Sequence, residues 1–260
     1  MPRSGVISGA SPRVALVTGA GRGIGRAIAV RLSREGYAVA LTARSADQLE
    51  GTASACDGAT LTFPADITDP GAVEQLFEDV EAALGLVEVL VCNAGGGVSA
   101  RVARTTDEDW QRMLDLNLTA PFRCVRRALP SMVERDIGRI VVIASIAAKI
   151  GEPYIAAYTA SKHGVLGLVR SAAAEVGGTG VTINAVCPGY VDTPMTDATV
   201  ARIVERTGRT EAEARAILAA KQPSGRLIRP DEVVEAVWSC VADGSINGRG
   251  IDVLGVGVQG

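Results

Sequence analysis

The sequence has few aromatic residues, a single histidine and no closely spaced cysteine pair. Phe, Trp and Tyr make up 3% of 260 residues, so the core must be built from aliphatic side chains and alanine. The five cysteines stand far apart and form no C-x-x-C pair, the usual sequence signal of a zinc site. Because His163 has no histidine partner, we expect no bound metal.

The sequence also lacks a strong net charge and a long apolar run. A formal net charge of −3 argues against a nucleic-acid partner. The longest apolar run, Ile140 to Ala148, is far shorter than the roughly 18 residues that span a bilayer. The first residues form no apolar signal-peptide core. We therefore expect a cytoplasmic protein without a membrane or nucleic-acid partner.

Short β-branched runs alternate with helical patterns along the whole chain. Seven strands are predicted, at Val14–Val17, Ala38–Thr42, Thr60–Phe63, Val87–Val91, Arg139–Ala144, Val181–Val186 and Gly250–Leu254. One long helix is predicted from Asp107 to Arg135, with a bend caused by its prolines. Such alternation predicts an α/β fold with a parallel sheet covered by helices on both faces.

The chain is expected to form one domain behind a short tail. Residues 1–12 are predicted to be a flexible N-terminal tail, and no linker or internal repeat divides residues 13–260. The stretch from Pro194 to Arg226 is too long for an ordinary connection and is rich in Ala, Glu and Arg. We interpret it as a helical lid over a substrate.

Small and hydrogen-bonding residues follow six of the predicted strands. In an open parallel sheet ligands bind beyond the carboxyl ends of the strands, so these segments predict a cleft. They are a glycine loop (Gly19, Gly21, Arg22, Gly23, Ile24 and Gly25), Ala43-Arg44, Asp66-Ile67, Asn93-Ala94-Gly95, Ser145 and Pro188-Gly189.

The glycine loop has the pattern G-x-x-x-G-x-G, formed by Gly19, Gly23 and Gly25. A tight turn before the free N–H groups of a helix start suits a pyrophosphate, although a plain turn has the same composition. After the second strand, no carboxylate precedes Asp47 to hold a ribose 2′-hydroxyl. Arg22 and Arg44 could instead hold a 2′-phosphate, which predicts NADP(H); the alternative is two solvated surface arginines.

Tyr158 and Lys162 are spaced to lie on one face of a helix, a turn apart. A free phenol has a pKa of about 10, too high for efficient proton transfer near neutrality. A nearby lysine ammonium would lower the pKa of the phenol, and Ser145 precedes the pair at a strand end. These three side chains are predicted to form a catalytic group.

Taken together, the motifs resemble the short-chain dehydrogenase/reductase family from about Arg13 to Gly257. The resemblance implies a Rossmann-type, doubly wound sheet of seven parallel strands. It implies that Tyr158 is the acid/base, that Lys162 lowers its pKa and binds the nicotinamide ribose, and that Ser145 holds the substrate oxygen. Asn117 would help to anchor a water in a proton relay.

The same resemblance implies how the cofactor is held. Asp66, followed by Ile67, would contact the adenine, and Asn93, Ala94 and Gly95 the middle of the cofactor. Pro188, Gly189 and Val191 would lie beside it, and Thr193 would contact the carboxamide. Two departures stand out: Cys92 replaces a common asparagine, and Val253-Leu254-Gly255-Val256 replaces Val-Asp-Gly-Gly, which puts local packing or a subunit contact in doubt.

The function implied is NADPH-dependent reduction of a ketone, such as a 3-oxoacyl thioester. Ala157–Val165 and Asn184–Gly189 resemble 3-oxoacyl thioester reductases and polyketide ketoreductases most closely. The alternatives are an NAD(P)-dependent secondary-alcohol dehydrogenase working in the oxidative direction and a non-catalytic NADP(H) sensor. The resemblance also implies a homotetramer or dimer built on the long helices before Ser145 and after Tyr158.

Overall fold

The computed structural model describes residues 12–256 and 258–259, so the predicted tail lies outside the described residues except at Pro12. The strands are β1 (Val14–Thr18), β2 (Ala38–Ala43), β3 (Thr60–Pro64), β4 (Val87–Cys92), β5 (Gly138–Ile143), β6 (Val181–Pro188), β7 (Gly250–Val253) and β8 (Val258–Gln259). The helices are α1 (Gly23–Arg34), α2 (Ala46–Ala53), α3 (Pro70–Leu84), α4 (Asp107–Leu114), α5 (Ala120–Glu134), α6 (Ala156–Glu175), α7 (Pro194–Thr207), α8 (Glu211–Ala220) and α9 (Pro230–Ala242).

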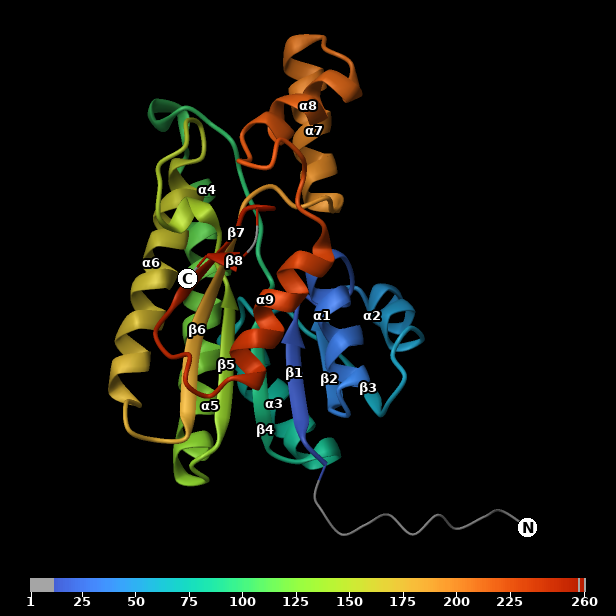
Figure 1. The fold of residues 1–260 in the computed structure, drawn as a ribbon, viewed down its shortest axis with the longest axis vertical. Helices are drawn as coiled ribbons and strands as arrows, with labels where there is room; N and C mark the ends of the chain where they lie inside the picture. The colour runs from blue at the N-terminus through green and yellow to red at the C-terminus, as the bar shows by residue number, and fades with distance from the viewer. Residues whose placement is uncertain (1–11, 257, 260) are drawn as a thin grey trace, which may run out of the picture.

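The strands form one sheet in the order β3-β2-β1-β4-β5-β6-β7-β8 (Figure 1). The first seven in the chain run parallel, which confirms the predicted doubly wound parallel sheet. The antiparallel β8 adds an unpredicted edge to β7. It spans two residues, too few to carry a sequence pattern.

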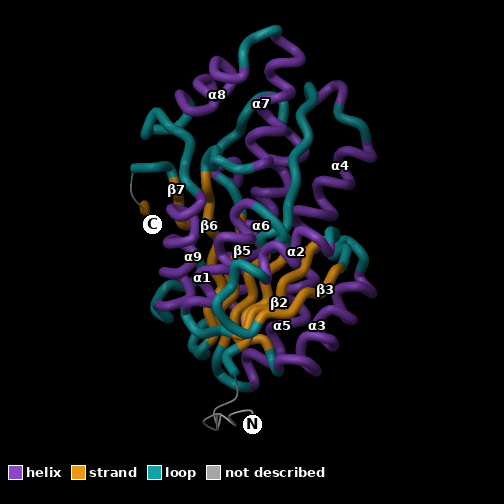
Figure 2. Tube along the Cα trace, turned by 90° about the vertical axis from the view of Figure 1, so that its right-hand side faces the viewer, coloured by secondary structure: helices purple, strands orange, loops and turns teal. Residues whose placement is uncertain are grey.

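Helices cover both faces of the sheet, as Figure 2 shows. Along β1, Val14 and Leu16 face a core shared with α3, α5 and α6. Ala15 and Val17 face a second core shared with α1, α2 and α9. Because both faces of the central strands are buried, these strands are continuously apolar, as the sequence predicted.

The predicted helix from Asp107 to Arg135 is interrupted by a wider, π-helical turn, η2 (Asp115–Thr119). The expectation of one regular helix is thus corrected, while the bend at the prolines stays a prediction. Pro121 follows the wider turn directly, as the second residue of α5, and α5 continues through Pro130. In the wider turn, the side chain of Asn117 donates to the Met113 carbonyl in 3.1 Å.

The stretch predicted as a lid folds into α7 and α8, which stand beyond the carboxyl ends of the strands (Figure 1). Gly208 ends α7 in the left-handed conformation, and a capping box of Thr210 and Glu213 starts α8. Val200, Ala214 and Leu218 form a small core between the two helices. The pair therefore packs as a unit of its own above the sheet.

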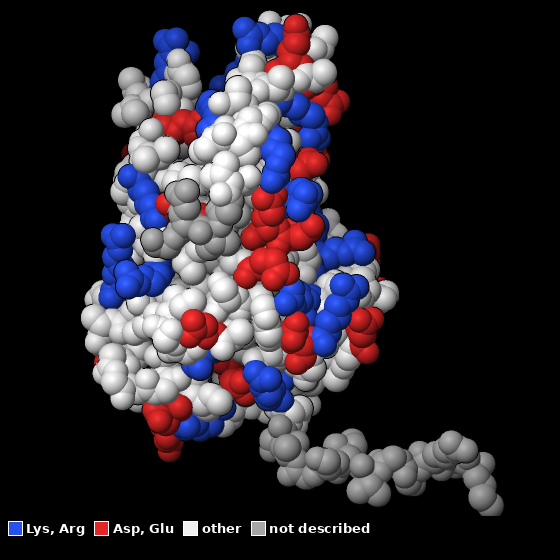
Figure 3. Space-filling view, in the orientation of Figure 1, with Lys and Arg blue, Asp and Glu red and all other residues white. Residues whose placement is uncertain are grey.

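Acidic and basic side chains are interspersed on the face drawn in Figure 3. Within residues 12–256 and 258–259, no helix combines the length and the apolar character that crossing a bilayer requires.

Candidate functional site

The strand order reverses between β1 and β4, and this point positions the site. β1 pairs with β2 on one side and β4 on the other, so the connections after β1 and β4 diverge. The Asn93 side chain donates to the Thr18 carbonyl in 2.9 Å, and the Asn93 and Ala94 N–H groups donate to the Thr18 hydroxyl in 3.0 and 3.1 Å. Sequence reasoning missed Thr18, although a hydroxyl ending an apolar strand was a visible signal.

The glycine loop wraps closely around the Asn93–Ala94 segment. Gly19 has φ +64°, and a side chain there would lie 2.8 Å from the Ala94 Cα. A side chain at Gly25 would clash with the Gly19 carbonyl and the Asn93 amide. These glycines allow α1 to begin close against the sheet, so that backbone N–H groups can come near a bound anion such as a pyrophosphate.

The N-terminus of α1 is open to an anion. Arg22 occupies the capping position without a capping hydrogen bond from its side chain, and the first turn holds no acidic residue. The free N–H groups of the first turn of α1 and the positive end of its helix dipole therefore point toward the predicted cleft. Gly23 has φ +56°, and a side chain there would lie 3.6 Å from the Thr193 methyl carbon, so the starts of α1 and α7 lie close together.

Two guanidinium groups stand near the ends of β1 and β2. Arg22 and Arg44 are exposed, and in the described part of the chain neither forms an ion pair within 4.0 Å.

Asp66, after β3, accepts hydrogen bonds from the Thr68 hydroxyl and N–H in 2.7 and 3.0 Å. These bonds, and the charge of Arg44, hold the pKa of Asp66 below its usual value. Ile67 beside it is buried.

Ser145, Tyr158 and Lys162 come together at the carboxyl ends of β5 and β6. Ser145 follows β5, and its hydroxyl accepts from the Ala147 N–H in 3.1 Å and lies 3.5 Å from the Pro188 carbonyl oxygen. The Lys162 ammonium donates to the Ile143 carbonyl in 2.8 Å and lies 5.7 Å from the centre of the Tyr158 ring. Ser145 lies close enough to Tyr158 to lower the pKa of its phenol.

Burial dominates the proton affinities of the pair. It lowers the pKa of Lys162 to about 8, since an ammonium loses hydration in the interior. It also raises the pKa of Tyr158, and the nearby Ser145 hydroxyl offsets only part of this rise. Lys162 is not among the groups that shift the pKa of the phenol here, so its lowering by Lys162 and the oxidised nicotinamide together stays a prediction.

Asn117 lies in the π-helical turn, 1% exposed, against the loop after β4. Its amide exchanges two hydrogen bonds with the Gly96 backbone, both 3.1 Å. A side chain at Gly95 would lie 2.9 Å from the Asn117 oxygen and 3.7 Å from the Lys162 nitrogen. The side chain of Asn117 thus holds the loop beside Lys162, and its implied part in anchoring a water stays a prediction.

The segment after β6 carries the remaining predicted cofactor contacts. Gly189 donates to the Val253 carbonyl in 3.1 Å, and a side chain on it would lie 2.8 Å from the Gln222 amide carbon. Val191 pairs with Ile228 in an isolated bridge, and the Thr193 hydroxyl donates to the Val191 carbonyl in 3.3 Å. This segment runs from the catalytic group to the start of α7.

Three side chains of the site carried no sequence signal. Tyr190 donates its hydroxyl proton to Glu152 in 2.8 Å, and Lys221 forms an ion pair with the same carboxylate. They come from three segments far apart in the chain, so spacing could not connect them.

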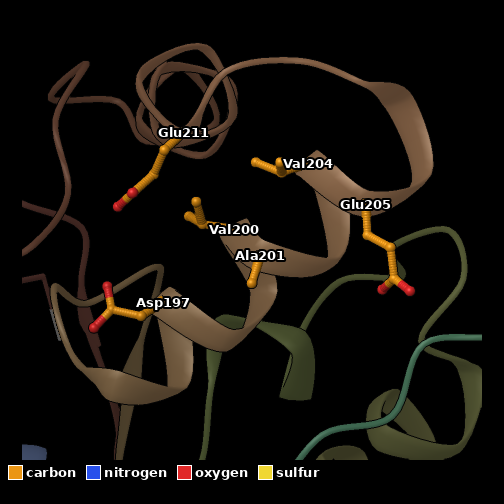
Figure 4. Close-up of a pocket in the computed structure, with 6 residues that line it drawn as sticks. All are labelled: Asp197, Val200, Ala201, Val204, Glu205 and Glu211. Carbon is orange, nitrogen blue, oxygen red and sulfur yellow. The ribbon is translucent and has the colours of Figure 1, made fainter.

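Two cavities in the described part of the chain lie apart from these groups. One, of about 470 Å³, lies between α7 and α8 and is lined by Val200, Ala201 and Val204 with three carboxylates (Figure 4). The other, of about 580 Å³, is lined by Thr68 and residues of α4 and η2. No group of three possible metal ligands occurs within residues 12–256 and 258–259.

The arrangement is comparable with that of known proteins. A family model described as short chain dehydrogenase matches residues 13–203. A Streptomyces coelicolor protein named as a ketoacyl reductase is 38% identical over 253 residues, covering 93% of this chain and 95% of that protein. The 3-oxoacyl-[acyl-carrier-protein] reductase MabA of Mycobacterium tuberculosis is 42% identical over 191 residues, covering 74% of each chain.

A solved structure of similar fold is a variant of the actinorhodin polyketide ketoreductase with NADPH. It has a TM-score of 0.90 at 36% identity and covers 94% of this chain and 96% of that one. The likeness thus extends over the sheet, both helical layers and the segment with α7 and α8. The reversed strand order, the glycine cradle and the group of Ser145, Tyr158 and Lys162 fit this match, and the chain belongs to the short-chain dehydrogenase family.

Proposed function

We propose that the protein is an NADPH-dependent ketone reductase whose substrate is a 3-oxoacyl thioester or a related polyketide-type ketone. The observation that carries the proposal is the convergence of Ser145, Tyr158 and Lys162 beside the glycine cradle. Two of the relatives are named for reduction of ketoacyl groups, and the ketoreductase neighbour was solved with NADPH.

The residues present fit a dinucleotide with an additional phosphate. The cradle at Gly19 and Gly25 has no room for a side chain, and the free N–H groups of α1 suit the pyrophosphate. Arg22 and Arg44 would hold the 2′-phosphate, with no carboxylate in Ala43–Ala46 to oppose it. We assign the adenine to Asp66 and Ile67, the middle of the cofactor to Asn93–Gly95, and the nicotinamide end to Pro188, Gly189, Val191 and Thr193. When bound, the reduced cofactor supplies the hydride.

The protein's own residues supply orientation and a proton. The Ser145 hydroxyl and the Tyr158 phenol would both donate hydrogen bonds to the ketone oxygen, which fixes it at one end of the cleft. Tyr158 then protonates that oxygen as negative charge develops on it. Lys162, held by the Ile143 carbonyl, stabilises the resulting phenolate and binds the nicotinamide ribose. Asn117 keeps the Gly95–Gly96 loop in place beside Lys162.

The mouth of the cleft favours an apolar substrate. Four large apolar side chains are exposed on the loops and helix start beyond the strand ends: Val102, Ile150, Tyr154 and Met195. Because exposed apolar groups of this size gain from being covered, they support contact with an acyl or polyketide chain. The lid of α7 and α8 would close over that chain. Reversal of the same steps would oxidise a secondary alcohol.

We further propose a cytoplasmic homotetramer or dimer. All five cysteines are free, which suits a reducing compartment. The helices before Ser145 expose Trp110, Phe122 and Val133, apolar side chains that a second subunit could cover.

A panel of ketones tests the proposed activity. Acyl-thioester, cyclic and aromatic ketones are incubated with NADPH and NADH in parallel, and loss of the reduced-nicotinamide absorbance is followed. We expect turnover with NADPH and at least one thioester or polyketide-like ketone. Tyr158→Phe should abolish turnover and leave NADPH binding nearly intact. NADPH binding without oxidation by any ketone would favour the sensor.

A further inference from the structure

The end of the lid is attached to the cleft by three side chains, here termed the clasp: Glu152, Tyr190 and Lys221. Glu152 precedes α6, Tyr190 follows β6, and Lys221 caps the end of α8. Tyr190 donates to the Glu152 Oε1 oxygen in 2.8 Å, and Lys221 pairs with the same oxygen. The Lys221 nitrogen also lies 5.5 Å from the centre of the Tyr190 ring.

The clasp lies beside the catalytic tyrosine. The charge of Glu152 contributes to the raised pKa of Tyr158, and Tyr158 contributes to that of Tyr190. Tyr190 directly follows Gly189, on which the Gln222 side chain packs. Lys221 and Gln222 therefore seat the end of α8 on the segment that carries the cofactor contacts.

The clasp differs from the other polar attachments of the lid, which, among the residues that the structure describes, do not reach the segment before α6; Arg226, for example, pairs with Glu232 of α9. Arg215 of α8 pairs with Asp192, Asp197 and Glu211, within the lid and the loop that starts it. Arg206 of α7 donates to the Ser99 carbonyl at 3.3 Å, a long hydrogen bond. The clasp instead joins the lid to the segment that leads into Tyr158.

The partial burial of the clasp supports a role in positioning the lid. The Glu152 side chain is 21% exposed, although that of Lys221 is 46% exposed. An isolated pair of this exposure would contribute little. A carboxylate shared by an ammonium and a half-buried phenol forms a network, and charge-assisted hydrogen bonds of this kind are the stronger ones.

We propose that Glu152 is a positioning residue that determines substrate specificity, because it holds Tyr190 and the end of α8 at a fixed distance from Tyr158. The inference rests on the proposed function in taking the substrate to be a ketone bound under the lid. The Tyr190 ring then forms a wall of the substrate site, and the clasp determines how closely the lid covers the ketone. The contacts assigned to the adenine, the 2′-phosphate and the pyrophosphate lie at the glycine cradle and the strand ends beside it and take no part in the clasp, so the affinity for NADPH should change little.

A double-mutant cycle tests the clasp. The variants are Glu152→Gln, Lys221→Met and the double variant, with Glu205→Gln as a matched control on the exposed side of α7 (Figure 4). We measure KM and kcat for a ketone, the Kd for NADPH, and hydrogen exchange of residues 194–226. Each single variant should raise KM about fivefold and speed exchange in the lid, with kcat and the NADPH Kd within about twofold. The double variant should be no worse than either single one, since both break the same pair.

Tyr190→Phe separates positioning from general stability. It keeps the ring and removes the hydrogen bond to Glu152, so exchange in the lid should rise while exchange in the sheet stays unchanged. Unchanged lid exchange in Glu152→Gln and Lys221→Met, or additive effects in the double variant, would overturn the proposal. If the wild type reduces no ketone, the proposed function fails, but lid exchange still reports on the clasp.

Discussion

At the scale of the residue, the site depends on a buried cation. Lys162 is 4% exposed and its ammonium is held by a backbone carbonyl, so part of its hydration is lost without compensation from a carboxylate in the described part of the chain. Burial therefore lowers the pKa of Lys162 to about 8. The positive charge of Lys162, which would stabilise a Tyr158 phenolate, therefore lowers the free energy of unfolding.

Lys162→Met should abolish activity, and it should also remove the free-energy cost of burying the lysine charge. Below pH 8 the lysine is protonated in both the folded and the unfolded chain, and burial of its charge disfavours folding. Between pH 8 and about 10.4 only the unfolded chain holds the proton, so the wild type regains stability there. We expect the variant to be more stable at pH 7 by on the order of 1–2 kcal/mol, less the cost of the unpaired Ile143 carbonyl. Denaturant titrations at pH 7 and pH 10 measure the difference, which should shrink at pH 10. A variant that is less stable at pH 7 would contradict the argument.

The same pKa predicts the pH dependence of turnover. Because the charged form of Lys162 is the one that stabilises the phenolate, the rate of ketone reduction should fall as pH rises above about 8. Initial rates at saturating NADPH between pH 6 and 10 provide the measurement. A rate that keeps rising through pH 9 would show that the neutral lysine suffices.

Arg44→Ala tests the choice of cofactor. A guanidinium on a 2′-phosphate has no counterpart in NADH, so the variant should weaken NADPH binding at least tenfold and NADH binding much less. Fluorescence titration with both cofactors gives the ratio, and Arg34→Ala, an exposed arginine paired with Asp57, is a matched control. Equal losses for the two cofactors would remove the 2′-phosphate assignment.

At the scale of the element, the contact between α1 and β1 decides whether a cradle exists. Gly25 is buried inside α1 at a place where a methyl group would meet the Gly19 carbonyl. Gly51 in α2 has nothing within 4 Å of the same position. The two glycines thus have different roles although both lie in helices.

Gly25→Ala and Gly51→Ala should therefore have opposite effects. At Gly25 the added methyl should push α1 away from the loop, with a loss of about 1–3 kcal/mol of stability and weaker NADPH binding. At Gly51 it should raise stability by about 0.5–1 kcal/mol, because alanine loses less backbone entropy in a helix. Thermal unfolding with and without NADPH measures both, and a neutral Gly25→Ala would contradict the steric argument.

At the scale of the whole molecule, the single chain leaves apolar surface uncovered on α4 and α5. Phe122 and Val133 are each 40% exposed and lie on α5. Light scattering at micromolar concentration should give a dimer or tetramer. The double variant Phe122→Glu/Val133→Glu should lower the measured mass of the assembly, because subunit association would then bury two charges at that contact. A wild-type monomer would contradict the assembly.

The sequence by itself was enough to predict the architecture and to single out the proposed catalytic set. Strand runs such as Val14–Val17 are apolar because both faces are buried, and this pattern is local, so it can be read from the chain. Tyr158 and Lys162 lie a helical turn apart, which spacing alone reveals. Thr18 carried a local signal as well, which sequence reasoning missed.

Only the tertiary structure decided what depends on neighbours remote in the chain. The clasp joins Glu152, Tyr190 and Lys221 from three segments, and no periodicity links them. The proton affinity of Tyr158 is set by burial, which arises when α6, β5 and β6 pack together. The Asn117 amide, in the π-helical turn, bonds to the backbone of Gly96, which lies in another segment. Spacing along a chain encodes contacts within one element, whereas contacts between elements are fixed by how the elements pack.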